Sequence, residues 1–275
     1  RKEAERLSAA APQSIDDYER LVVSSPNASL VWVHYMAFHL KTSQVPMART
    51  TAERALKVIS VREEAERFNV MQAWLNLELA FGTEATLAPV LSRAMQSFEP
   101  LKVLLHVANV YEKKSDTEKA QQTYDQLIKK CRDAPETWIQ YGQFLFRQGQ
   151  AKAAQSQLEK ALKSVDPVHH VALIQNFARS DYVYGHREHG ITLFESLISQ
   201  YPKRTDIWNV YLDQEARGGA ERLESVRRLY HRVLTNKLST KKGKALFKKW
   251  LQYENQYGDA KGVDAVRQAA LAYVE

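Results

Sequence analysis

The sequence predicts an all-α solenoid of about seven antiparallel helical hairpins. At seven places, an aromatic or large apolar residue is followed three positions later by another, and often seven positions later by Glu or Asp. These motifs begin at positions 32, 71, about 104, 138, 174, 208 and 247, so their steps are roughly 33 to 39 residues, the range expected for a helical-hairpin array. Only 10 Gly and 8 Pro occur in 275 residues, which leaves little of the chain for tight turns.

The motif itself predicts the first helix of each hairpin. Residues at i, i+3 and i+7 lie on one face of an α-helix, so the first two fill the space towards the partner helix. The clearest copies are Trp208–Tyr211–Glu215 and Phe247–Trp250–Glu254, and the segment around Leu104 and Tyr111 is the least recognisable. We expect twelve residues at these packing positions: Trp32, Tyr35, Met71, Trp74, Trp138, Tyr141, Ile174, Phe177, Trp208, Tyr211, Phe247 and Trp250.

The acid at i+7, seven residues after the first residue of the motif, has two interpretations. It can satisfy a neighbouring backbone amide or pair with a basic residue of the next helix, or it can be a solvated carboxylate at a helix end. The sequence favours neither. The first copy carries His39 at this position, which we interpret as a departure from the motif and not as a ligand.

Small and branched residues predict the second helix of each hairpin, as in Ala48–Leu56 and Val226–Leu234, and Pro and Gly occur where hairpins should end. We expect an N-terminal tail or helix over residues 1–13 and a repeat solenoid over 14–275. The solenoid would start with a half-repeat cap at 14–26, because a repeat array needs a polar terminal cap. Its repeats would begin near 29, 68, 101, 135, 168, 205 and 243.

Composition excludes several classes of protein. No apolar run approaches the 18 residues of a membrane-spanning helix. Cys131 is the only cysteine, so no internal disulfide can form, which fits a reducing compartment. The chain begins with Arg1 in a charged segment without the apolar core of a signal peptide, and we expect it to be part of a longer protein.

The motif Trp-x-x-Tyr-x-x-x-Glu, followed by Arg-x-x-x-x-Arg-Ala/Val-Leu in Arg49–Leu56 and Arg227–Leu234, resembles the HAT (half-a-TPR) repeat. Three further segments, Tyr201–Tyr211, Trp138–Leu145 and Ala269–Glu275, resemble the C-terminal helical region of a large nucleolar rRNA-processing factor that also carries OB-fold RNA-binding beads. The resemblance implies a right-handed superhelical solenoid of the HAT/TPR type. It also implies a role in pre-rRNA cleavage and small-subunit maturation. The beads are absent from this chain, so their RNA contacts cannot be assigned to it.

Positive charge is concentrated in the last quarter of the chain. Residues 201–275 hold 15 Lys and Arg against 9 Asp and Glu, a net charge of +6, whereas the first 200 residues hold 24 against 23. Lys and Arg neutralise phosphates without reading base sequence, so this clustering favours a binding surface for RNA or for an acidic protein tail over a solvated helix face. The candidate RNA-binding residues are Lys203, Arg204, Arg227, Arg228, Arg232, Lys237, Lys241, Lys242, Lys244, Lys248 and Lys249.

We expect no catalytic activity, no cofactor and no metal. His169, His170, His186 and His189 lack the three or four convergent ligands that a zinc site requires, and no phosphate-binding Gly loop or nucleophile elbow is present. The sequence and the resemblance therefore predict a scaffold in the nucleus and nucleolus that binds pre-rRNA and small-subunit assembly factors. We expect no membrane partner, and self-association is left open. The alternative is a protein-only adaptor or self-association module of another RNA-processing complex, which an exposed apolar groove would favour.

Overall fold

The computed structural model describes residues 12, 14–236 and 238–274. These residues form α-helices, two short 3-10 helices and connecting turns, with no strand in the described ranges. The predicted tail or helix at 1–13 lies almost wholly outside the described residues. The chain divides into two compact units, Arg1–Cys131 and Arg132–Glu275.

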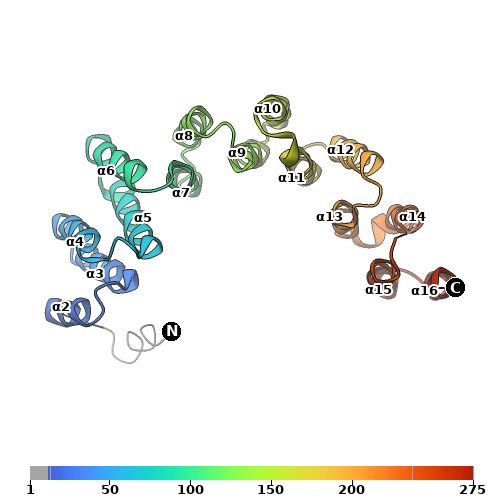
Figure 1. Cartoon of the computed structure of the whole chain (residues 1–275), viewed down its shortest axis with the longest axis horizontal. Coiled ribbons are helices and arrows are strands. Elements are labelled where there is room, and N and C mark those ends of the chain that lie inside the picture. The colour runs from blue at the N-terminus through green and yellow to red at the C-terminus, as the bar shows by residue number, and fades with distance from the viewer. Residues whose placement is uncertain (1–11, 13, 237, 275) are drawn as a thin grey trace. The chain divides into compact units, whose positions relative to one another are not determined.

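The first unit consists of antiparallel helices in two rows (Figure 1). One row holds α3, α5 and α7, and the other holds α2, α4, α6 and α8. Their bounds are α2 Ile15–Ser24, α3 Ser29–Lys41, α4 Val45–Val58, α5 Glu64–Phe81, α6 Glu84–Ser97, α7 Pro100–Lys113 and α8 Thr117–Lys130.

The second unit repeats this arrangement, with α9, α11, α13 and α15 in one row and α10, α12, α14 and α16 in the other. Its helices are α9 Pro135–Arg147, α10 Ala151–Ser164, η1 Pro167–His169, α11 His170–Tyr184, α12 Arg187–Gln200, α13 Thr205–Ala216, η2 Gly219–Arg222, α14 Leu223–Leu234, α15 Thr240–Tyr257 and α16 Ala260–Val274. The odd-numbered helices from α3 to α15 begin close to the expected repeat starts. The division after Cys131 falls within residues 14–275, which the motif spacing predicts to be one array.

Local sequence signals explain several helix starts. The Ser14 hydroxyl accepts a hydrogen bond from the Asp17 amide, and the Asp17 carboxylate accepts one from the Ser14 amide, which makes a capping box before α2. Asp116 caps α8 by accepting from the Lys119 amide. Pro100 and Pro135 stand at the first positions of α7 and α9, where the missing N–H costs no helical hydrogen bond.

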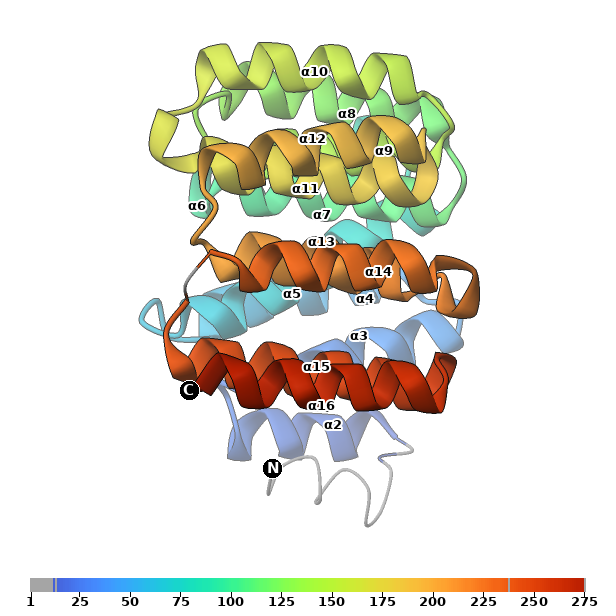
Figure 2. The ribbon, with the colours of Figure 1, turned by 90° about the vertical axis from the view of Figure 1, so that its right-hand side faces the viewer.

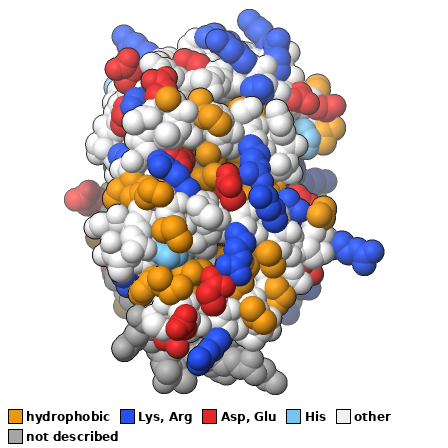
Figure 3. All heavy atoms as spheres, turned by 90° about the vertical axis from the view of Figure 1, so that its left-hand side faces the viewer, with side chains coloured by type: hydrophobic (Ala, Val, Ile, Leu, Met, Phe, Trp, Pro, Cys, Tyr) orange, Lys and Arg blue, Asp and Glu red, His pale blue; other side chains and the backbone are white. Residues whose placement is uncertain are grey.

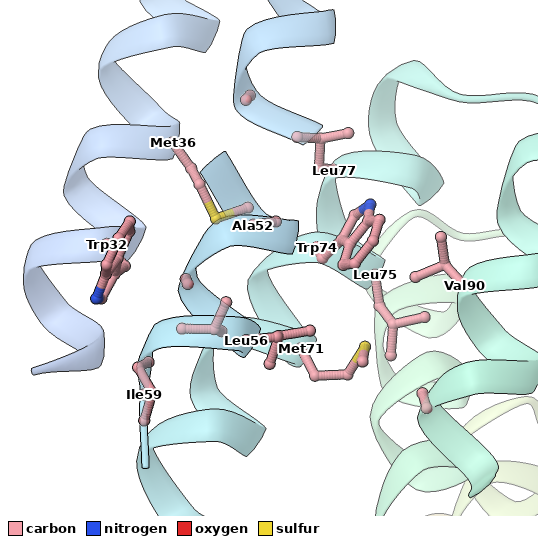
Figure 4. Packing of buried hydrophobic residues seen from close by; sticks show 14 of the residues in the cluster. Trp32, Met36, Ala52, Leu56, Ile59, Met71, Trp74, Leu75, Leu77 and Val90 are labelled. Carbon is pink, nitrogen blue, oxygen red and sulfur yellow. The ribbon is translucent and has the colours of Figure 1, made fainter. Parts of the chain in front are cut away.

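The core lies between the two rows of helices. In the first unit, Figure 4 shows Met36 of α3 reaching Ala52 of α4, and Leu75 of α5 pointing towards Val90 of α6. Ala52 is fully buried, and its small side chain leaves room for the larger side chains of the neighbouring helices. The large residues of the motif and the small residues of the second helix therefore form one packed layer.

Candidate nucleic-acid interface

The Trp residue at the first position of the motif is fixed to the loop before its helix. The indole N–H groups of Trp32, Trp138 and Trp208 each donate to a backbone carbonyl six residues earlier, at 2.9, 2.8 and 2.8 Å. The acceptors are Pro26, Arg132 and Pro202. These rings are buried and hydrogen-bonded, so they are not available for stacking on a base.

Nearly all of the predicted packing residues are buried. Eleven of the twelve are at most 7% exposed, and Ile174 is half-buried against the core of the second unit. Leu104, from the least recognisable copy, is also fully buried. The aromatic content of the motif is thus used in the core and leaves no row of motif rings at the surface.

The acid at the seventh position points inwards. Glu78, Asp181, Glu215 and Glu254 are all at most 3% exposed. Where Trp stands at the second position, its indole donates to this acid four residues later, as Trp74 does to Glu78 at 3.2 Å. The interpretation as a solvated helix-end carboxylate is therefore wrong for these four acids.

An arginine from the preceding helix pairs with each buried glutamate. Arg49 of α4 donates two hydrogen bonds to Glu78 of α5, at 2.7 and 2.8 Å. Arg227 of α14 makes the same double contact with Glu254 of α15, at 2.8 and 2.9 Å. A planar guanidinium matches a carboxylate in this geometry, so each pair joins one hairpin to the next.

The remaining two acids use variations of the same contact. Arg187 of α12 donates to Glu215 of α13 at 2.6 Å. The Asp181 carboxylate of α11 accepts a hydrogen bond from the side-chain amide of Gln155 at 3.1 Å and also pairs with the His189 ring. At the corresponding position of the first copy, His39 is fully buried and hydrogen-bonds Gln44 at 3.1 Å.

These contacts shift the carboxyl pKa values. Hydrogen bonds from Arg227 hold the pKa of Glu254 below its usual range, although burial opposes this shift. For Glu78, burial raises the pKa, but hydrogen bonds from Arg49, Thr86 and Trp74 together outweigh it and keep the pKa low. Both groups are therefore ionised and paired at neutral pH.

A second recurring contact, not predicted from the sequence, surrounds the first-position Trp. Arg232 bridges to Glu195 on α12 at 2.7 Å, and its guanidinium lies over the Trp208 ring at 5.7 Å. In the first unit, Arg54 makes the same bridge to Glu19 and lies over Trp32. The spacing from acid to arginine, 35 residues in one case and 37 in the other, is the sequence signal that could have found it.

The structure divides ten of the eleven candidate RNA-binding residues into two groups. Four form internal ion pairs: Arg227 with Glu254, Arg232 with Glu195, Arg204 with Asp206, and Lys249 with Asp213. Arg227 is only 24% exposed and holds two hairpins together, so it is a structural residue.

The second group is exposed and makes no ion pair with any residue that the structure describes. Its members are Lys203, Arg228, Lys241, Lys242, Lys244 and Lys248. The eleventh candidate, Lys237, lies outside the described residues.

One of these exposed lysines, Lys242, lies beside α13 near the amino-terminal end of α15. Thr205 and Asn209 of α13 line a hollow of about 150 Å³ together with Lys242 and Lys249 of α15. Lys203 lies two residues before α13 begins, and the first turn of α15 contains no acid. Helix amino termini carry partial positive charge, which adds to that of the lysines. Asp206 in the first turn of α13 pairs with Arg204, and Asp213 pairs with Lys249, whereas Lys203 and Lys242 make no described ion pair.

Lys244 and Lys248 lie elsewhere on α15. They border an apolar groove between α15 and α16, away from the hollow at α13. On the side of the first unit seen in Figure 3, Lys and Arg are interspersed with Asp, Glu and hydrophobic side chains.

The four candidate histidines lie in two pairs, at the junction of η1 and α11 and at the start of α12. The His186 amide donates to Asp181 at 3.0 Å, and His170 hydrogen-bonds the Val165 carbonyl at 2.9 Å. Within the described ranges, no three His, Cys, Asp or Glu residues are placed to hold a metal ion. Nor is any helix there long and apolar enough to cross a membrane.

Two family models match parts of the chain. The C-terminal HAT repeat of pre-mRNA-splicing factor Syf1/CRNKL1 matches residues 176–275, and the middle TPR-like domain of cilia and flagella-associated protein 70 matches residues 104–204. Among solved structures, the C-terminal part of a TPR repeat-containing protein from Cytophaga hutchinsonii is 13% identical. It covers 91% of this chain and 92% of its own, with a TM-score of 0.41.

The curated relatives are more closely similar. Protein RRP5 homolog of Mus musculus is 44% identical over 96% of this chain, and rRNA biogenesis protein rrp5 of Schizosaccharomyces pombe is 41% identical over 96%. The RRP5 protein of Arabidopsis thaliana is 39% identical over 98% of the chain. The chain spans only 14 to 15% of the length of these three relatives. It is therefore homologous to a segment of the RRP5 proteins and contains HAT/TPR-like repeats.

Proposed function

We propose that this chain is a non-catalytic scaffold in ribosome biogenesis, acting in the nucleus and nucleolus. In that role it supports pre-rRNA cleavage and small-subunit assembly by binding pre-rRNA and assembly factors. The observation that carries the proposal is the 39 to 44% identity, over at least 96% of the chain, to proteins named for rRNA biogenesis or as RRP5 homologs.

The basic edge consists of the exposed Lys203, just before α13, and Lys241 and Lys242 in the first turn of α15, and it supports the RNA-binding part of this proposal. These side chains are exposed and are not used in the described ion pairs, so they can neutralise phosphates at no cost to the fold. Contacts of this kind position a protein on RNA without reading its sequence. Sequence selection would then come from other parts of a full-length protein or from its partners.

The buried acids support the non-catalytic assignment. Glu78, Glu215 and Glu254 each pair with an arginine inside the repeat array. A general acid or base must reach a substrate proton, and these carboxylates face the interior.

A replacement experiment in cells tests the proposal. The full-length protein would carry Lys203→Glu and Lys242→Glu, and pre-rRNA intermediates would be measured by northern hybridisation. We expect precursors of the small-subunit rRNA to accumulate at least twofold. The matched control carries Lys57→Glu and Lys130→Glu, two exposed lysines of the first unit, and should process normally. Normal processing in both variants would contradict the RNA-binding role of the edge.

A further inference from the structure

The second unit has an apolar groove between α15 and α16, which lie side by side in Figures 1 and 2. Its volume is about 560 Å³. Phe247 and Leu251 of α15 and Val266 and Leu271 of α16 form most of its floor. A groove of this size accepts several side chains of a bound helix, and its apolar floor favours hydrophobic side chains.

In the preceding hairpins, the helix that follows packs over the surface that corresponds to this groove. Tyr230 of α14 stacks on Trp250 of α15, with ring centroids 5.3 Å apart. Leu56 of α4 is 5% exposed and lies beside Met71 of α5 (Figure 4). Leu271 of α16 is 70% exposed, and α16 packs mainly against α15. The groove is thus a surface that the described helices leave open.

The rim of the groove is positively charged. Lys244, Lys248 and Arg267 border it, and no Asp or Glu lines it. Arg267 contacts Asp264 at 3.4 Å, but both side chains are more than 60% exposed, so this pair is weak and can be replaced. Lys244 and Lys248 make no described ion pair. Three cations around an apolar floor are complementary to a helix with an apolar face flanked by carboxylates.

RNA fits this surface poorly. Phosphates could pair with the lysines, but they would leave Leu251 and Leu271 exposed to water. Nor is Tyr273 presented for stacking, because its hydroxyl donates to the Leu238 carbonyl at 2.8 Å and its ring packs edge-on against Phe247. A protein helix can use both the apolar floor and the cations.

We propose that the α15–α16 groove binds an amphipathic helix of a partner protein, whose Asp or Glu residues face Lys244, Lys248 and Arg267. The helix takes the place that the first helix of a further hairpin would have. The inference deepens the proposed function by naming the kind of partner, and it rests on that function only in assuming that a partner exists. It assigns Lys244 and Lys248 to protein binding, and leaves the edge at Lys203 and Lys242 to RNA.

Photo-crosslinking identifies the occupant. A photoreactive amino acid would replace Leu271 in the full-length protein in cells, and crosslinked peptides would be sequenced by mass spectrometry. The control position is Val61, which is 79% exposed in the first unit. We expect position 271, and not position 61, to crosslink to one protein segment. Its apolar residues should recur every three or four positions, next to Asp or Glu.

The same segment, synthesised as a labelled peptide, tests the charges. Lys244→Glu with Lys248→Glu should weaken its binding at least tenfold, whereas Lys203→Glu with Lys242→Glu should leave it unchanged. A crosslink to RNA, to a second copy of this chain or to nothing would overturn the proposal, as would a peptide insensitive to the reversal at 244 and 248. Because the RNA variants are different residues, failure here leaves the proposed RNA contact standing.

Discussion

At the scale of single residues, the buried carboxylates of the motif are the most consequential feature. Each of Glu78, Glu215 and Glu254 loses its hydration, and an arginine of the preceding helix replaces it. Removing one partner of a buried pair is far more costly than losing a surface pair, because it strands a charge in the interior.

Substitution of Arg227 tests this contact. Arg227→Met should lower the free energy of unfolding by about 3 kcal/mol, since it leaves Glu254 buried without its partner. The adjacent Arg228 is exposed and forms no described ion pair, so Arg228→Met should change stability by less than about 0.5 kcal/mol. Urea denaturation of both variants measures the difference. Equal losses would mean that the Arg227 pair contributes no more than an exposed side chain.

The lowered pKa of Glu254 makes stability depend on pH. The folded protein binds fewer protons at this site than the unfolded chain, in which Glu residues have a pKa of about 4.3. The contribution is therefore present above that pH and is lost as the pH falls through the lower, folded pKa. Glu254→Gln should show a smaller loss of unfolding free energy between pH 7 and pH 4 than the unsubstituted protein. Parallel pH profiles would contradict a depressed pKa.

The inward direction of these acids could not be obtained from the sequence. The i+7 spacing places Glu254 on the face of Trp250, but only the partner decides whether a carboxylate there is buried. That partner, Arg227, lies 27 residues away on another helix. Local patterns contain no information about such a contact unless both helices are already placed.

At the scale of helices, the hairpins were predictable because their signals are local. Period, capping residues and Pro or Gly positions act within a few residues, as at Ser14, Asp116 and Pro135. The close approach of first helices to each other was not predictable in the same way. Gly142 of α9 illustrates it, because a Cβ added there would lie 2.4 Å from the Phe177 ring of α11.

The substitution Gly142→Ala therefore has two opposite effects on stability, one through helix propensity and one through packing. Alanine is better than glycine in a helix by about 1 kcal/mol, but overpacking a core costs about 1–3 kcal/mol. We expect a net loss of stability in thermal or urea unfolding. Combining it with Phe177→Leu, which makes room for the methyl group, should give a smaller total loss than the sum of the single changes. A stabilised Gly142→Ala variant, or strict additivity, would show that the contact is not tight.

At the scale of the whole molecule, the repeat type and the excess of positive charge in the last quarter are both evident from the sequence. The division after Cys131 is not, because the motif spacing continues across it. Nor does charge counting separate structural cations from exposed ones. Arg227 and Arg228 are neighbours in sequence, yet the first holds two hairpins together and the second faces solvent.

The most direct test of the account is fluorescence anisotropy of this chain with labelled pre-rRNA segments at several salt concentrations. We predict binding at about micromolar concentration or tighter that weakens as salt increases, because phosphate contacts release counterions. Lys203→Glu with Lys242→Glu should weaken binding and flatten the salt dependence, while Lys244→Glu with Lys248→Glu should change it much less. Absence of binding near physiological salt, or equal sensitivity to both pairs, would contradict an RNA contact at the edge of α13 and α15.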